Sequence, residues 1–134
     1  MTEFDHVTTD AAVDVYESSV PIFRGILREV RELSKKRPET TMSAGKVKIV
    51  NRVLSDLLVV LKDEPAGKYL EVLNDEALPQ MSDAVLAMVQ FESALASFHA
   101  RYHKYVGSKQ YWITQEIVAA WNEDSEEPDA DNEE

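Results

Sequence analysis

Cysteine is absent from this chain of 134 residues, and so is any long apolar run. Without thiols the chain can form no disulfide, no thiolate metal site and no cysteine nucleophile. The longest apolar stretches are interrupted by Asp56, Lys62 and Glu92, so none approaches the roughly 20 residues that a membrane-spanning helix needs. The first ten residues also lack the basic segment and apolar run of a secretory signal. We therefore expect a soluble cytoplasmic protein with no membrane segment.

Basic residues are missing from positions 122–134, which hold eight acids. The whole chain has a formal net charge of −11, so the other residues together carry only −3. A chain with this charge repels a phosphate backbone, which disfavours duplex nucleic acid as a partner. Because 122–134 has almost no apolar side chains to bury, we expect it to be a disordered acidic tail.

A helical period of three to four residues runs through most of the remaining chain. The clearest example is 82–106. Ser82 can cap the first turn of this helix, and Gly107 can adopt the left-handed conformation that ends helices. The apolar stripe between them contains Ala84, Met88, Phe91, Leu95, Phe98, Tyr102 and Tyr105.

A first helix is expected from Asp10 to near Arg37, and its apolar stripe passes through Pro21. Proline costs about 3 kcal/mol in a helix interior but is tolerated in a first turn. One kinked helix and two helices with a cap at Ser18 or Ser19 therefore both fit, and the unbroken stripe favours the kinked helix. The stripe contains Val13, Tyr16, Val20, Phe23, Leu27 and Val30.

A second helix is predicted over 43–62, with Ser43 as its cap. Its main stripe contains Val47, Val50, Leu54, Leu57 and Leu61, and a second stripe on another side contains Ile49, Val53 and Val60. A helix that is apolar on two sides needs two partners, so we place it centrally. A short helix is expected over 65–73 and another after Gly107, ending at Trp121, although QYWIT has strand-like propensity and leaves its start open.

These elements predict an all-α protein, a compact bundle of four to five helices. Residues 1–9 show no period and are expected to form a flexible N-terminal arm. The bundle would occupy 10–121 as a single domain, followed by the acidic tail.

Two histidines give the sharpest chemical signal. His99 and His103 are spaced i, i+4, which places both imidazoles on one helix face about 6 Å apart along the axis, as in paired metal ligands. The residue after His99 is alanine, so the glutamate of an HExxH zinc protease is missing. Glu92 lies about 10 Å further down the axis, and other ligands would have to come from another helix. His99 and His103 are thus a candidate pair of metal ligands. The alternative is that they are partly buried histidines that bind no metal. No cofactor is expected.

A basic row follows the first helix at steps of four, three and four residues, and it contains Arg24, Arg28, Arg31 and Lys35. Such rows are usually solvated faces. The alternative is a surface for an acidic partner or for the chain's own tail. Aromatic residues near the end of the 82–106 helix are also typical of interface anchors, and Tyr102, Tyr105 and Trp112 are the candidates for an interface.

No assembled catalytic set is visible, so we expect no enzyme. The favoured function is protein–protein interaction, as an adaptor, inhibitor or regulatory subunit that can also form a homo-oligomer. One alternative is a helical-bundle enzyme or metal-binding protein centred on His99 and His103. Another is an acidic mimic of nucleic acid, in which carboxylates imitate phosphates.

Overall fold

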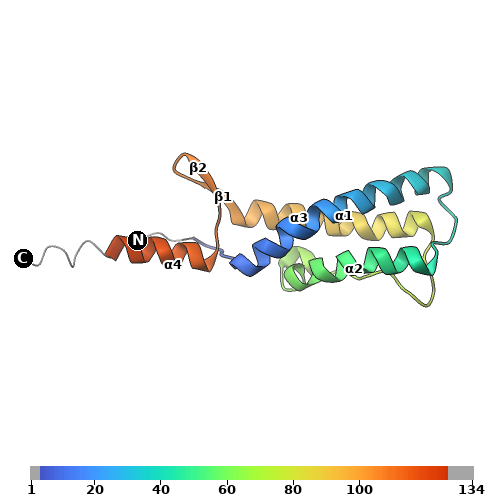
Figure 1. Ribbon diagram of the computed structural model, residues 1–134, viewed down its shortest axis with the longest axis horizontal. Coiled ribbons are helices and arrows are strands. Elements are labelled where there is room, and N and C mark those ends of the chain that lie inside the picture. The colour runs from blue at the N-terminus through green and yellow to red at the C-terminus, as the bar shows by residue number, and fades with distance from the viewer. Residues whose placement is uncertain (1–3, 127–134) are drawn as a thin grey trace, which may run out of the picture. The chain divides into compact units, whose positions relative to one another are not determined.

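The computed structural model describes residues 4–126, which are mostly helical with one two-stranded sheet (Figure 1). The helices are α1 (Asp10–Lys36), α2 (Ala44–Leu61), α3 (Met81–Tyr102) and α4 (Gln115–Glu126), and a 3₁₀ turn covers Pro65–Gly67. The strands are β1 (His103–Val106) and β2 (Lys109–Trp112). Over the described range, no helix combines the length and apolar character that crossing a membrane requires.

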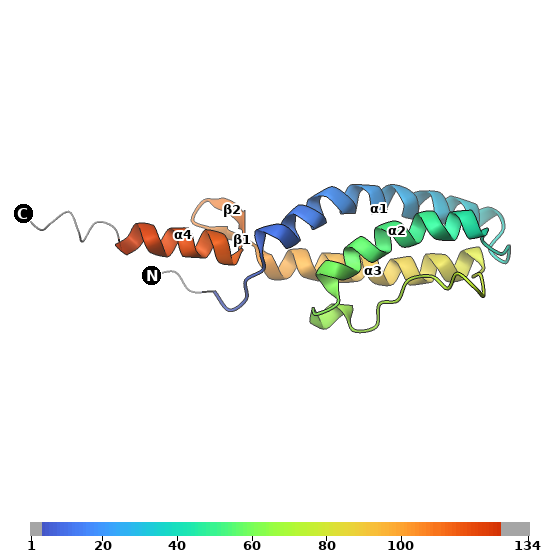
Figure 2. The ribbon, with the colours of Figure 1, turned by 60° about the horizontal axis from the view of Figure 1, so that its bottom comes forward.

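These residues form two compact units. Unit 1 comprises 4–14 and 99–126, and unit 2 comprises 15–98. In unit 2, α1 runs antiparallel to α2 and α3, which run in the same direction and are joined by the connection 62–80 (Figures 1 and 2). The single domain expected over 10–121 stays a prediction.

The three predicted apolar stripes form the core. All members of the main stripes of α1 and α2 are buried, as are the α3 stripe residues from Ala84 to Tyr102. Within unit 2, the Phe23 and Phe91 rings lie 6.5 Å apart and the Tyr16 and Phe98 rings stack at 5.5 Å between centroids. Helical periodicity therefore identified this core correctly from sequence.

Pro21 lies inside α1, which is one helix from Asp10 to Lys36. The prediction of a single helix through Pro21 is confirmed. Ser43 caps α2 as expected, since its side chain accepts a hydrogen bond of 3.2 Å from the Lys46 amide. The buried stripe thus predicted correctly that the chain stays helical through the proline.

The predicted cap at Ser82 is wrong, because α3 begins at Met81. Its first amides are satisfied instead by the α1–α2 connection: Met81 donates to the Thr40 carbonyl at 2.9 Å and Ser82 donates to the Pro38 carbonyl at 3.0 Å. These backbone acceptors come from a distant part of the chain, so no local pattern could indicate them.

The short helix predicted over 65–73 is also wrong, because only Pro65–Gly67 is helical and only as a 3₁₀ turn. A Cβ at Gly67 would overlap the carbonyl oxygen of Leu61, so the chain packs there against the end of α2. The following connection is held by Asn51, whose side-chain amide donates to the Leu73 carbonyl and accepts from the Leu73 amide, both at 2.8 Å.

The all-α prediction is wrong for unit 1, which contains a two-stranded sheet. The helix expected to end at Gly107 ends at Tyr102, and β1 and β2 form an antiparallel hairpin in which His103 faces Trp112 and Val106 faces Lys109. Gly107 does take a positive φ of 68°, but in the hairpin loop and not at a helix end. Glycine at the first loop residue is typical of a tight hairpin turn, and the aromatic and β-branched residues on both sides favour strands.

A parallel β-bridge between Thr8 and Thr114 joins the starts of α1 and α4. Thr8 donates to the Ile113 carbonyl at 2.9 Å and accepts from the Gln115 amide at 2.8 Å. The flexibility predicted for the arm over 1–9 stays a prediction. At the other end, α4 continues through 122–126, beyond the expected end at Trp121, and the rest of the predicted tail lies outside the described residues.

Candidate functional site

An apolar groove of about 350 Å³ lies between α1 and α2 in unit 2. The exposed fractions are 51% for Ile49 and 37% for Leu33, and Ile22, one turn before the groove on α1, is 59% exposed. A continuous apolar surface rimmed by polar groups is typical of an interaction site. The groove is lined by Gly25, Ile26, Glu29, Val30 and Leu33 of α1 and by Lys46, Ile49 and Val50 of α2.

The groove exists because the second apolar stripe of α2 is only partly covered. Val53 is buried and Val60 is half-buried, but Ile49 is exposed. The second stripe of α2 is therefore covered in the middle of the helix and exposed in its first turns, and the central position predicted for α2 stays a prediction. At those turns the second side of the helix has no covering element among the described residues.

Two charged residues and one glycine mark this groove. Glu29 lies on the α1 wall and Lys46 on the α2 wall, and neither forms an ion pair with any residue in the described range 4–126. Gly25 lies in the interior of α1, where a Cβ would meet no atom within 4 Å. Within unit 2 the glycine is not required by packing.

The basic row of α1 is partly paired. Arg31 forms an ion pair of 3.2 Å with Glu92, and Lys35 forms one of 3.1 Å with Glu32. Arg24 and Arg28 line a cleft of about 260 Å³ beside Glu92. The assignment of the row to a charged partner stays a prediction, since half of its charge is already balanced within unit 2.

Tyr16 is the one group in unit 2 with a resolved pKa shift. Its side chain is 8% exposed, and this burial raises the pKa of the hydroxyl above its ordinary value because the phenolate loses hydration. The positive charge of Arg24 opposes this rise. The shift reflects core packing and gives no sign of a reactive site.

The two histidines do lie together, in unit 1. The His99 and His103 rings stack at 4.5 Å between centroids, and Trp112 of β2 meets both edge-on at 5.3 and 5.0 Å. The side chain opposite the histidine pair is thus the indole of Trp112, which is not a metal ligand. Among residues 4–126, no group of three or more His, Asp and Glu side chains could hold a metal ion. His6 lies elsewhere, with Nδ1 3.0 Å from an Arg101 nitrogen.

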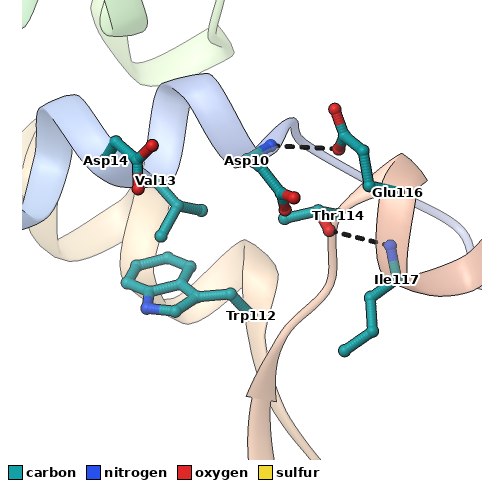
Figure 3. Close-up of a pocket in the computed structure, with 7 residues that line it drawn as sticks. All are labelled: Asp10, Val13, Asp14, Trp112, Thr114, Glu116 and Ile117. Atoms are coloured by element: carbon teal, nitrogen blue, oxygen red, sulfur yellow. Dashed lines mark hydrogen bonds between the residues drawn. The ribbon is translucent and has the colours of Figure 1, made fainter.

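Trp112 also lines a pocket of about 500 Å³ in unit 1 (Figure 3). Three carboxylates surround it: Asp10 and Asp14 in the first turns of α1, and Glu116 in the first turn of α4. Glu116 accepts a hydrogen bond of 3.0 Å from the Asp10 amide. Asp10 and Glu116 lie in the first turns of their helices, where carboxylates complement the helix dipole, and no ligand is assigned to this pocket.

The three predicted interface residues are in different environments. Tyr102 is only 5% exposed and offers little area to a partner, whereas Tyr105 on β1 is 70% exposed. Trp112 is half-buried against the histidines. The interface assignment stays a prediction, and Tyr105 is the member with the most surface to offer.

The groove itself was missed from sequence. Its available signals were the second stripe of α2, which includes Ile49, and the apolar Ile22 and Ile26 on a side of α1 away from the main stripe.

A scan of protein-family models and searches of curated proteins and solved structures found no match to this chain.

Proposed function

We propose that this protein acts by protein–protein interaction, as an adaptor, inhibitor or regulatory subunit in the cytoplasm, and that the α1–α2 groove of unit 2 is its binding surface. The groove lies between two helices and is lined mainly by aliphatic side chains. A surface of this kind fits the apolar face of an amphipathic helix, whose residues at i, i+3 and i+4 fill it.

The observation that carries this proposal is the exposure of large aliphatic residues around one groove. Ile22, Leu33 and Ile49 are all more than one-third exposed, although nearby Val30 and Val50 are buried. Exposed apolar area has an unfavourable hydration free energy of about 25 cal/mol per Å², which a partner's apolar face would remove.

The experiment is site-specific photocrosslinking of the full chain in its native cell. A benzophenone amino acid replaces Ile49 in the groove or, as the matched control, Leu86, which is 63% exposed on α3. We expect an adduct from position 49 whose attachment site in the partner lies on an apolar helix face. The adduct should disappear with Leu33→Asp in the same groove.

Two results would reject the groove as the binding surface. One is the absence of any adduct from position 49, and the other is an identical set of adducts from position 86. Circular dichroism of each variant checks that the helices are retained.

The competing proposal is an enzyme or metal protein centred on His99 and His103. Substituting alanine at both histidines distinguishes it from the interaction protein. If the protein's cellular activity survives that double substitution, the competing proposal is rejected. If the protein were a nucleic-acid mimic, it would compete with DNA for binding to a basic protein. A competition experiment with the purified chain measures this.

A further inference from the structure

We infer that the partner at the α1–α2 groove is the same groove of a second copy of this chain. The inference rests on the proposed function, because it names the occupant of that surface. It is supported by the two unpaired charges on the groove walls and by a glycine in the α1 wall.

The groove is self-complementary in charge. Glu29 on the α1 wall and Lys46 on the α2 wall have no ion-pair partner among residues 4–126. A two-fold symmetric interface brings the same patch of both copies together, so each wall can meet either its own equivalent or the opposite wall.

The direction of the two-fold axis decides which walls meet. With the axis along the groove, α1 of one copy lies over α2 of the other, and Glu29 meets Lys46 of the second copy twice. With the axis across the groove, α1 lies over α1, so Glu29 meets Glu29 and Lys46 meets Lys46. Like charges disfavour the second arrangement, and opposite charges favour the first.

The first arrangement also suits the helices. Because α1 and α2 are antiparallel in each copy (Figure 2), α1 of one copy is antiparallel to the α2 that it covers. Four helices with antiparallel neighbours are a common packing unit. Ile49 is then buried against α1 of the second copy and Leu33 against its α2.

Gly25 fits the same interface. Glycine destabilises a helix interior relative to alanine, and no atom of residues 4–126 lies within 4 Å of its Cβ position to require it. The distance between packed helix axes depends on the side chains at the contact. A glycine in the groove wall lets the helix of the second copy approach closely.

The test is sedimentation equilibrium of the full chain. We expect the wild-type chain to form a dimer, and Glu29→Lys and Lys46→Glu each to weaken dimerisation about tenfold by turning two attractive contacts into repulsive ones. An equimolar mixture of the two variants should recover wild-type affinity as a mixed dimer, because one copy then carries two bases and the other two acids.

Lys48→Glu is the matched control, since Lys48 is an exposed residue of α2 that does not line the groove. A wild-type chain that stays monomeric overturns the inference, and so does a dimer that Lys48→Glu weakens as much as Lys46→Glu. Failure of the mixture to recover affinity also overturns it. Thermal unfolding of each variant confirms that the fold is intact.

The failure of this inference is distinguishable from the failure of the proposed function. A monomeric chain whose position 49 still crosslinks to a helix of another protein keeps the proposed function and rejects the second copy. No adduct at all from position 49 rejects both.

Discussion

Unit 2 and unit 1 are stabilised by different interactions. Unit 2 consists of three long helical segments whose apolar stripes bury large side chains such as Phe23, Leu54 and Phe91 completely. Unit 1 relies on short elements joined by backbone pairing, with the Thr8–Thr114 bridge and the β1–β2 hairpin as its main links. Unit 2 therefore depends mainly on buried apolar area, whereas unit 1, which buries fewer large side chains, also depends on individual hydrogen bonds and caps.

The largest effect is expected for Phe91→Ala in unit 2. Phe91 is fully buried against Phe23, and removing a buried phenylalanine ring costs about 3–5 kcal/mol of the free energy of unfolding. Urea denaturation measures the change. Leu86→Ala on the exposed side of the same helix is the control and should change the free energy by less than about 0.5 kcal/mol. Equal losses at the two positions would contradict a core-dominated unit 2.

Thr114→Ala in unit 1 should have a smaller effect. The Thr114 hydroxyl is buried and accepts a hydrogen bond of 3.1 Å from the Ile117 amide at the start of α4. Losing such a cap costs about 0.5–2 kcal/mol. Amide hydrogen exchange of α4 should accelerate while that of α2 stays unchanged. Thr114→Ser retains the hydroxyl and should restore slow exchange, so fast exchange in both variants would contradict the capping function.

Gly25→Ala should raise the free energy of unfolding of the monomer by about 0.5–1 kcal/mol, because alanine favours the helix interior and its methyl group would meet no atom. Thermal denaturation at low protein concentration measures this. Gly67→Ala should destabilise the chain, because the Cβ of the alanine would overlap the Leu61 carbonyl. A loss of stability at Gly25 would show that this wall of α1 is already packed.

The smallest effect is expected from Tyr16 at alkaline pH. Its pKa is raised in the folded state by burial, partly offset by Arg24. The unfolded chain then releases this proton at lower pH than the folded chain. The stabilising contribution is therefore complete below about pH 10, the ordinary tyrosine value, and is lost as the pH rises through the folded pKa.

Thermal unfolding from neutral to alkaline pH tests this, with Tyr16→Phe compared with Tyr69→Phe, a substitution at a side chain that is 75% exposed. The loss of stability above about pH 10 should be shallower for Tyr16→Phe than for wild type. Identical slopes for wild type and Tyr16→Phe would contradict the assignment.

The difference between local periodicity and contacts with distant residues explains what the sequence could predict. The stripes containing Phe23, Leu54 and Phe91 have a period that local geometry imposes, so the three long helical segments and the core of unit 2 were predicted. The α3 cap and the Thr8–Thr114 bridge depend on partners far away in the chain, which a local pattern does not contain. Gly107 shows the limit clearly: its positive φ was predicted, but both a helix end and a hairpin loop require it.

Individual residues of the candidate site could be predicted from the sequence, but their arrangement in a groove could not. Ile49 was identified as part of a second apolar stripe, and the stripe was expected to be covered. Whether a stripe is covered depends on how many helices pack around α2, and this is a property of the tertiary fold. The His99–His103 pair was predicted to share a helix face, whereas its neighbour Trp112 comes from a strand that was expected to be helical.

The five isoleucines of the chain allow one direct test of dimerisation through the groove. Ile22, Ile26 and Ile49 lie in or beside the groove of unit 2, whereas Ile113 and Ile117 belong to unit 1. Methyl NMR spectra of the isoleucine-labelled full chain are recorded as its concentration is raised. We predict concentration-dependent shifts for the three methyl groups at the groove and none for Ile113 and Ile117. Shifts confined to Ile113 and Ile117, or no shifts at any of the five, would contradict dimerisation through the groove.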